Sequence, residues 1–144
     1  MKRILVLFLV LVTTIFAEVK TELTSYKVLV DKDGVKSKVE ATEATPGDII
    51  GYNFFISNGT EEALERISPT IPVPAGTTFI PDEGDPKNYL VSINERDFSP
   101  YPIMQDGVPV DDSQYRLVSW NIEKLEPGES LNLEIQVKVN GGVN

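Results

Sequence analysis

The chain has 144 residues, of which 13 are basic and 22 acidic, so its formal net charge is −9, and it contains neither cysteine nor histidine. Without these two residue types it cannot by itself form a disulfide, a thiolate metal site or a Ser-His-Asp triad, and it lacks the commonest zinc ligand. An acidic chain with no basic cluster repels phosphate backbones, so nucleic acid is excluded as an expected partner.

The first segment, MKRILVLFLVLVTTIFA, is typical of an export signal. Lys2 and Arg3 precede a short apolar run that ends at the small residue Ala17, as in a secretory signal peptide. The run is shorter than the roughly 20 residues that a membrane-spanning helix needs. We predict a signal peptide over residues 1–17 and one mature domain over residues 18–144, with formal charge 11 − 22 = −11. An uncleaved N-terminal anchor is the alternative.

The mature chain then contains a predicted hairpin. Within SYKVLVDKDGVKSKVEAT, two strand-like runs flank the stretch Asp31-Lys32-Asp33-Gly34. Polar turn formers that end in glycine between two such runs are a hairpin signal.

Two stretches far apart in the chain resemble one another, TPGDIIGYNFFISN at 45–58 and EPGESLNLEIQVKVN at 126–140. Each begins with Pro-Gly and an acidic residue, which favours a type II turn with glycine at positive φ. Each continues with alternating apolar positions, which predicts a long strand with one buried face. The other face of the first stretch is less polar, so we expect that strand to be more central. The predicted inward residues are Ile50, Tyr52, Phe54 and Ile56 in the first stretch and Leu131, Leu133, Ile135, Val137 and Val139 in the second.

Short strand-like runs fill the region between these stretches. LERISPTIPVP carries Pro69, Pro72 and Pro74, and because proline cannot donate a ladder hydrogen bond, we predict an edge strand or an early break there. GTTFIP, NYLVSIN and YRLVSWNI follow, separated by turn residues. Trp120, the only tryptophan, alternates with apolar neighbours and is expected in the core.

No window of the mature chain has convincing helical periodicity. Frequent turn signals between short strands are typical of two packed antiparallel sheets. The sequence therefore predicts an all-β fold, an immunoglobulin-like antiparallel β-sandwich of about seven to eight strands that lacks the core disulfide.

The order of these motifs resembles the conserved repeat domain of unknown function found in bacterial and archaeal surface proteins. The resemblance covers nearly all of the mature chain and departs from the family at Asn58-Gly59-Thr60, where members more often have a residue between Asn and Gly. It implies an immunoglobulin-like module of cell-surface or envelope proteins, usually in arrays, although this chain carries a single copy. The matching positions are Pro46, Gly47, Asp48, Tyr52, Asn58, Pro72, Pro74, Gly76, Thr77, Trp120, Pro127, Gly128 and Glu129.

Three acidic loops are candidates for calcium, which takes six to eight oxygen ligands. They contain Asp31 with Asp33, Asp82-Glu83-Gly84-Asp85, and Asp111-Asp112, and none matches the EF-hand loop. Because aspartate is a common turn former, solvated turns are the favoured interpretation, and a meeting of two loops at one end of the fold would favour a metal. Glu61-Glu62 and these loops also offer paired carboxylates for glycoside hydrolysis, but so small a domain leaves no element to build a cleft.

Phe98 and Tyr101 lie in the proline-punctuated stretch RDFSPYPIM. Exposed aromatic rings on such a loop can stack on sugars or on a partner chain, whereas capping of the open end of the core is the favoured interpretation. Asn58-Gly59-Thr60 fits the glycosylation pattern and is otherwise a turn. SPTIP formally contains Pro-x-x-Pro, but it lies inside a strand-like run and is interpreted as structural.

These features predict an exported, non-catalytic structural or protein-interaction module of the cell envelope or surface. We expect envelope or surface proteins as partners, no cofactor, and membrane contact only through the signal segment during export. The expected location is the periplasm, the cell surface or the medium. The alternative is a carbohydrate- or calcium-binding module that uses loops at one end of the sandwich. No catalytic, cofactor-binding or metal-ligating residue is assigned.

Overall fold

The computed structural model describes residues 18–141. This part of the chain is all-β, with thirteen strands in antiparallel sheets, no α-helix, and two short 3-10 helices, η1 (Pro81–Glu83) and η2 (Asp112–Gln114). It contains no helix long and apolar enough to cross a membrane. The predicted signal peptide, residues 1–17, lies outside the described residues.

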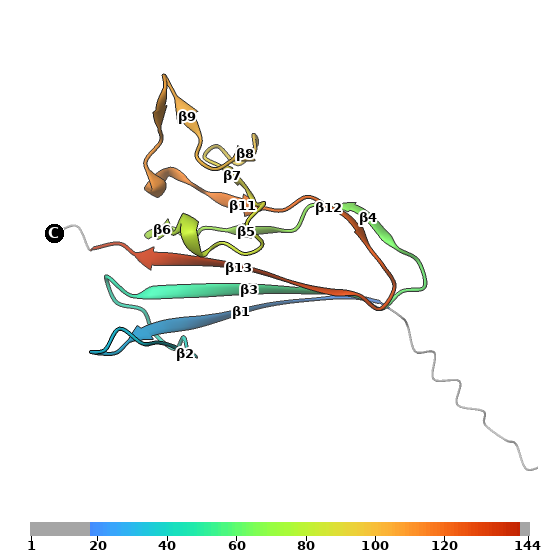
Figure 1. Cartoon of the computed structure of the whole chain (residues 1–144), viewed down its shortest axis with the longest axis horizontal. Helices are drawn as coiled ribbons and strands as arrows, with labels where there is room; N and C mark the ends of the chain where they lie inside the picture. Colours follow the sequence, from blue (N-terminus) through green and yellow to red (C-terminus); the bar gives the residue numbers. More distant parts are fainter. Residues whose placement is uncertain (1–17, 142–144) are drawn as a thin grey trace, which may run out of the picture.

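A five-stranded sheet in the order β2-β1-β3-β13-β6 forms one side of the molecule (Figure 1). The long strand β3 lies between β1 and β13, as expected for the more central of the two similar stretches. The strands are β1 (Val19–Val30), β2 (Lys36–Glu40), β3 (Ile49–Asn58), β6 (Thr77–Phe79) and β13 (Ser130–Val139).

A four-stranded sheet in the order β5-β11-β7-β8 lies on the side of β6 and β13, away from β1 and β2 (Figure 1). Two ribbons complete the fold, one of β4 with β12 and one of β9 with β10. The four-stranded sheet has β5 (Thr70–Pro72), β7 (Leu90–Ser92), β8 (Ser99–Pro100) and β11 (Leu117–Ser119), and the ribbons have β4 (Leu64–Ile67), β9 (Met104–Gln105), β10 (Val108–Pro109) and β12 (Ile122–Leu125).

The hydrophobic core joins residues of both sheets. Leu133, Ile135 and Val137 of β13 are fully buried, and they lie in one cluster with Val91 of β7 and Val118 of β11. The alternation in β13 therefore places one face of the strand in the core, as the sequence predicts.

Trp120, which follows β11, is fully buried, which confirms the sequence prediction. Its indole N–H donates to the carbonyl oxygen of Pro86 at 2.8 Å, and its ring meets that of Tyr89 edge to face. A buried indole with its single donor satisfied adds apolar contact without an unpaired polar group.

Both Pro-Gly-acid stretches are turns with glycine at positive φ, 91° at Gly47 and 81° at Gly128. The N–H of Asp48 donates to the carbonyl oxygen of Thr45 at 3.0 Å. In the second turn the N–H of Glu129 donates to the carbonyl oxygen of Glu126, also at 3.0 Å. A bonded turn with positive φ at its third residue is the predicted type II form.

The proline-rich run breaks between β4 and β5, and β5 is an edge strand that includes Pro72, as predicted. The strand count differs from the seven to eight expected, because the region between the two long strands divides into segments of two to four residues. Strands this short show no clear alternation of apolar and polar residues in the sequence, since so few residues do not define a period.

Candidate functional site

The N-terminal half of β1 forms an open edge of the five-stranded sheet. On one side β1 pairs with β3 from Val19 to Val28, but on the other side, within residues 18–141, it pairs only through Tyr26–Val30, with β2. Every residue from Val19 to Ser25 is exposed, and Figure 1 shows β2 beside only one end of β1. We call Val19–Ser25 the open edge. Unpaired strand edges are templates for strand addition.

The direction of each backbone group at the open edge follows from the ladder with β3. The carbonyl oxygen of Glu18 accepts a hydrogen bond from the N–H of Gly59 at 3.0 Å, so Glu18 points its peptide groups toward β3. In an antiparallel ladder this direction alternates along the strand. Val19, Thr21, Leu23 and Ser25 therefore present their N–H and C=O groups outward, away from β3.

The two faces of the open edge differ in chemistry. Val19 and Leu23 lie on the face that carries the core residues of β3, since Leu23 is opposite Phe54 in the ladder. They remain 39% and 53% exposed because the four-stranded sheet lies toward β6 and β13. Lys20 and Glu22 occupy the opposite face. The open edge thus combines unpaired backbone groups, an apolar face and a charged face.

A cluster centred on Tyr26 holds β1 against the rest of the sheet. The Tyr26 ring lies over Gly51 of β3, where a side chain would occupy the position of the ring. The Tyr26 hydroxyl reaches across β3, donates to a carboxylate oxygen of Glu134 and accepts from Gln136 at 3.1 Å. Lys38 of β2 lies 4.5 Å from the centre of the Tyr26 ring.

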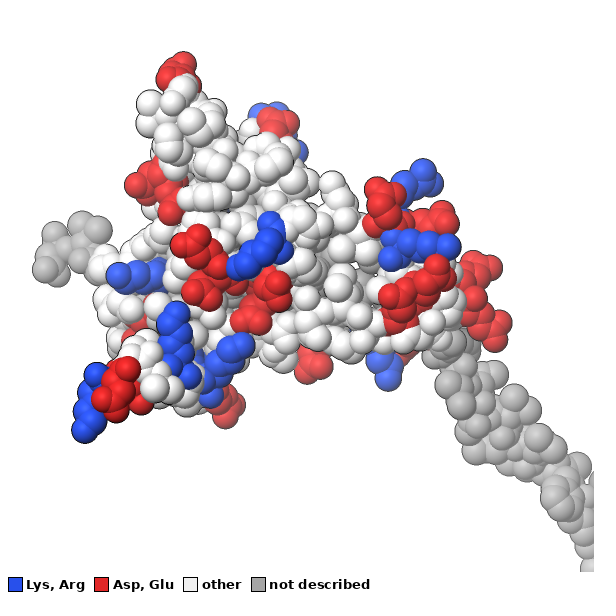
Figure 2. Space-filling model, in the orientation of Figure 1, with Lys and Arg blue, Asp and Glu red and all other residues white. Residues whose placement is uncertain are grey.

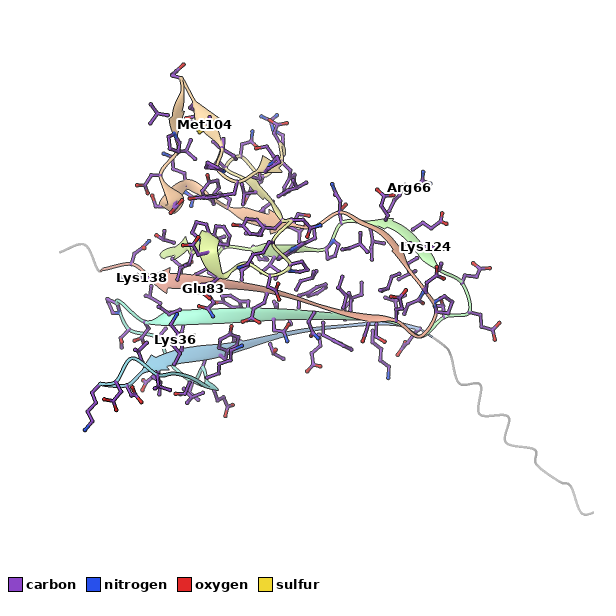
Figure 3. The ribbon with its side chains drawn as sticks, viewed as in Figure 1. Lys36, Arg66, Glu83, Met104, Lys124 and Lys138 are labelled. Atoms are coloured by element: carbon purple, nitrogen blue, oxygen red, sulfur yellow. The ribbon has the colours of Figure 1, made fainter. Side chains whose placement is uncertain are left out.

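Partial burial raises the pKa of the Glu134 carboxyl above its ordinary value. The Glu134 carboxylate also pairs with Lys38 Nζ at 3.3 Å, and Lys36 of β2 reaches Glu83 of η1 at 3.6 Å (Figure 3). A carboxyl with a raised pKa is a feature of active sites and of structural ion-pair networks alike. Here each charge has an opposite partner, and the contacts join β2 and η1 to the sheet.

A second candidate site is an open depression of about 470 Å³ beside Tyr101 and Tyr89. Tyr101 is 37% exposed, its ring packs on buried Tyr115 with centroids 5.5 Å apart, and its hydroxyl donates to Asp112 at 3.0 Å. We call this hollow the tyrosine depression. It is lined by Pro81, Asp82, Lys87, Asn88, Tyr89, Pro100 and Tyr101.

Both tyrosine hydroxyls of the depression stay protonated at neutral pH. Burial raises the pKa of Tyr101 to about 12, with a further contribution from the hydrogen bond to Asp112. Burial likewise raises the pKa of Tyr89 to about 12, helped by the negative charge of Asp82. The depression therefore offers one partly exposed ring, neutral hydroxyls, an amide, a cation and a carboxylate, a mixture suited to a polyhydroxylated ligand.

Two of the three candidate acidic loops are hydrogen-bonded turns, and the third begins in η1, with Asp85 bridged to Glu134 of β13. Asp31 accepts the N–H groups of Asp33 and Val35, each at 2.8 Å, in the predicted hairpin. At the start of η2, Asp111 accepts the hydroxyl of Ser113 and, at 2.9 Å, its N–H. These two hydrogen bonds, that of the hydroxyl foremost, lower the pKa of the Asp111 carboxyl. Within residues 18–141 no three acidic side chains are gathered in a way that could hold a metal ion.

Asn58 is a structural residue. It is fully buried, and its side-chain amide donates to the carbonyl oxygens of Glu62 and Leu125, each at 2.9 Å. Its side-chain oxygen accepts from Thr60, so the whole glycosylation-like stretch serves the turn that leads to β4. This arrangement agrees with the turn interpretation of Asn58-Gly59-Thr60.

Tyr101 combines the two interpretations, since it contacts the core and is also partly exposed. Its ring meets that of buried Tyr115 at 56°, while 37% of Tyr101 remains exposed at the tyrosine depression. For Phe98, which is 38% exposed, the described residues give no packing against the core cluster. Glu61 and Glu62 lie after β3 and line a separate shallow hollow with Leu64, away from the tyrosines.

The open edge was missed in the sequence, although a signal for it exists. The predicted hairpin starts at Ser25, but the alternation starts at Val19, so the first strand is far longer than its partner Lys36–Glu40. A long strand beside a short one leaves unpaired backbone groups, unless a third strand covers them.

Acidic and basic side chains are mixed around the β1–β2 turn and around the ribbon of β4 and β12 (Figure 2).

Comparison of the chain with protein-family models, with curated proteins and with solved structures gives no match. The family resemblance based on the turn and core motifs therefore stays a prediction. The structure establishes an all-β, antiparallel, multi-sheet fold for residues 18–141.

Proposed function

We propose that this chain is an exported, non-catalytic interaction module of the cell envelope or surface, built on an immunoglobulin-like β-sandwich. Two antiparallel sheets that share one core support the sandwich. The predicted resemblance of the turn and core motifs to surface repeat domains supports the cellular context. The signal peptide over residues 1–17 would deliver it, and N-terminal sequencing of the protein from its host should then begin at Glu18.

The observation that carries this proposal is the open edge of β1. A partner segment that adds as a strand to Val19–Ser25 would gain main-chain hydrogen bonds, and alternate side chains would give specificity. The chemistry favours a partner strand with apolar residues on the side of Val19 and Leu23 and charged residues on the side of Lys20 and Glu22.

We propose that the chain is not catalytic because its carboxylates have structural roles. Asp31 and Asp111 accept hydrogen bonds from turn backbone, and Asp48 accepts the N–H of Thr45 at 2.9 Å. Glu134, with its raised pKa, is bonded to Tyr26 and paired with Lys38. Each of these groups has a structural partner, so none is poised as a free acid or base.

Thr21→Pro tests the proposal directly. Thr21 points its N–H away from β3, so proline there removes an outward donor and leaves the ladder with β3 intact. We expect a pull-down from the host envelope to lose its partners with this variant. Glu40→Pro is the matched control, because Glu40 also lies on an edge strand, at the end of β2. Capture that is unchanged by Thr21→Pro would contradict a role for the open edge.

A second candidate function is binding of a saccharide at the tyrosine depression. The partly exposed Tyr101 ring, held by Asp112 and Tyr115, supports it, because sugar rings stack on rigid aromatic side chains. Titration with envelope oligosaccharides, followed by nuclear magnetic resonance, should shift residues around Tyr101, and Tyr101→Ala should remove the response. Phe98→Ala, an equally exposed aromatic of the same stretch, should keep it. Unperturbed spectra throughout would eliminate this candidate.

A further inference from the structure

The open edge of β1 is complementary to itself when two copies run antiparallel. With Thr21 placed opposite Thr21 of a second copy, Val19 faces Leu23 on the apolar side. On the charged side Lys20 faces Glu22, and the two-fold symmetry repeats each pairing. Apolar, hydroxyl and opposite-charge pairs directly across an antiparallel ladder are the favourable ones.

The backbone agrees with this register. Within Val19–Leu23, the residues whose N–H and C=O groups point away from β3 are Val19, Thr21 and Leu23. Opposite residues of a hydrogen-bonded antiparallel pair exchange both bonds. In the register centred on Thr21, every outward N–H and C=O of these three residues therefore finds a partner in the second copy.

The neighbouring registers are unfavourable. A shift by two residues is the smallest that keeps outward groups opposite outward groups. In one direction it places Lys20 opposite Lys20, and in the other Glu22 opposite Glu22, and like charges directly across a ladder repel. A further shift in one direction brings Lys20 opposite Tyr26, whose edge is already paired with Glu40 of β2. In the other direction it pairs Lys20 with Glu18, but it leaves Thr21 and Leu23 without partners in a chain that begins at Glu18.

We propose that a second copy of this chain is the partner of the open edge, joined by antiparallel pairing of the segments Val19–Leu23 about a two-fold axis at Thr21. The two five-stranded sheets then form one continuous sheet. This inference rests on the proposed function, since it names the occupant of the same edge. In a chain that begins at Glu18, this first residue lies opposite Thr24 of the second copy. The N-terminus therefore stops before the part of β1 that β2 covers.

The interface is short, and an interface well below about 1,200 Å² belongs to the weak class. We therefore expect protein beginning at Glu18 to change from monomer to dimer across the micromolar concentration range in sedimentation measurements. Thr21→Pro should remain monomeric at the highest concentration. A monomer at every concentration would overturn the inference.

Charge reversal tests the register. Lys20→Glu places two like-charge pairs across the axis and should weaken the dimer roughly tenfold. Lys20→Glu combined with Glu22→Lys gives opposite-charge pairs without any like-charge pair in this register alone, and should recover dimerisation. If the single and double variants dimerise equally, the register is wrong.

Cross-linking tests the axis, and the chain has no cysteine to interfere. In Thr21→Cys the two thiols lie directly opposite one another, with Cα atoms about 5.5 Å apart, so a short bis-maleimide should link two chains. In Thr24→Cys, an exposed threonine of the same edge, the two thiols are roughly 20 Å apart and should not be linked. Equal linkage of the two variants would contradict the two-fold axis.

The same experiments separate this inference from the proposed function. If the protein stays monomeric but captures envelope proteins, and Thr21→Pro abolishes that capture, the open edge has another occupant and only the self-pairing is wrong. If the protein neither dimerises nor captures a partner, both proposals fail. Circular dichroism of each variant establishes that it is folded before it is scored.

Discussion

Tyr26 and Gly51 show how a single close approach positions the edge strand. The tyrosine ring occupies the space above Gly51 and carries its hydroxyl to Glu134 and Gln136 on the far side of β3. Glycine is the one residue that leaves room for this crossing. The contact connects β1, β3 and β13 through one side chain.

Gly51→Ala should therefore destabilise the protein by about 1–3 kcal/mol, because the new methyl group displaces the Tyr26 ring and its hydrogen bonds. Urea denaturation measures the loss. Gly141→Ala is the control, since its Cβ would meet no neighbouring atom. In a Tyr26→Ala background, Gly51→Ala should cost much less, and an equal cost in both backgrounds would refute the steric explanation.

Asp48 makes stability depend on pH. The hydrogen bond from the backbone of Thr45 lowers the pKa of its carboxyl below the ordinary value, and Lys27, 3.1 Å away, adds to the effect. A carboxyl whose folded pKa lies below its unfolded value contributes stability above the unfolded pKa, about 3.9, and this contribution is lost as the pH falls through the folded pKa.

We expect Asp48→Asn to be less stable than the parent at neutral pH, and the difference to shrink as the pH falls below about 4. Thermal unfolding at a series of pH values measures both curves. A difference that stays constant across the series would assign the contribution of Asp48 to hydrogen bonding that asparagine cannot reproduce, not to charge.

At the scale of elements, the two Pro-Gly turns form a reciprocal pair. The N–H of Gly47 donates to the carbonyl oxygen of Val139 at 2.8 Å, and the N–H of Gly128 donates to that of Asn58 at 2.7 Å. Each turn therefore begins one long strand and bonds the end of the other. The similarity between the two stretches reflects this arrangement of β3 and β13 as antiparallel neighbours.

Gly47→Ala and Gly128→Ala should each lower the free energy of unfolding by about 1–2 kcal/mol, because both glycines have positive φ and a Cβ is disfavoured there. Chemical denaturation should give similar losses at the two turns. Asparagine at either position should cost less than alanine, since it tolerates the left-handed region better. A neutral effect of alanine at both positions would contradict the turn assignment.

At the scale of the whole molecule, Trp120 belongs to the core that both sheets share. Trp120→Ala should cost roughly 3–5 kcal/mol, because it leaves a large cavity and an unpaired carbonyl oxygen at Pro86. Trp120→Phe should cost less, since it retains most of the buried volume. Equilibrium unfolding followed by circular dichroism measures both, and a loss below about 1 kcal/mol for the alanine variant would place the indole outside the core.

Much of the fold was predictable from local patterns. The alternation in 45–58 and 126–140 predicted two long strands with the correct buried faces, because side chains of a strand alternate with a period of two. Pro-Gly predicted both turns, since proline and glycine restrict or permit particular φ values. Pro72 predicted an edge strand, because proline lacks the donor that an inner strand needs.

The sequence by itself thus determined the strand faces, the principal turns and the burial of Trp120, all of which depend on residues within one turn or one strand. Only the tertiary structure decided how far β2 extends along β1, which leaves Val19–Ser25 open. It also brought Tyr26 to Glu134 and Tyr101 to Asp112. These features depend on pairing between distant segments, and the extent and partners of such pairing are not encoded in the period of any one strand.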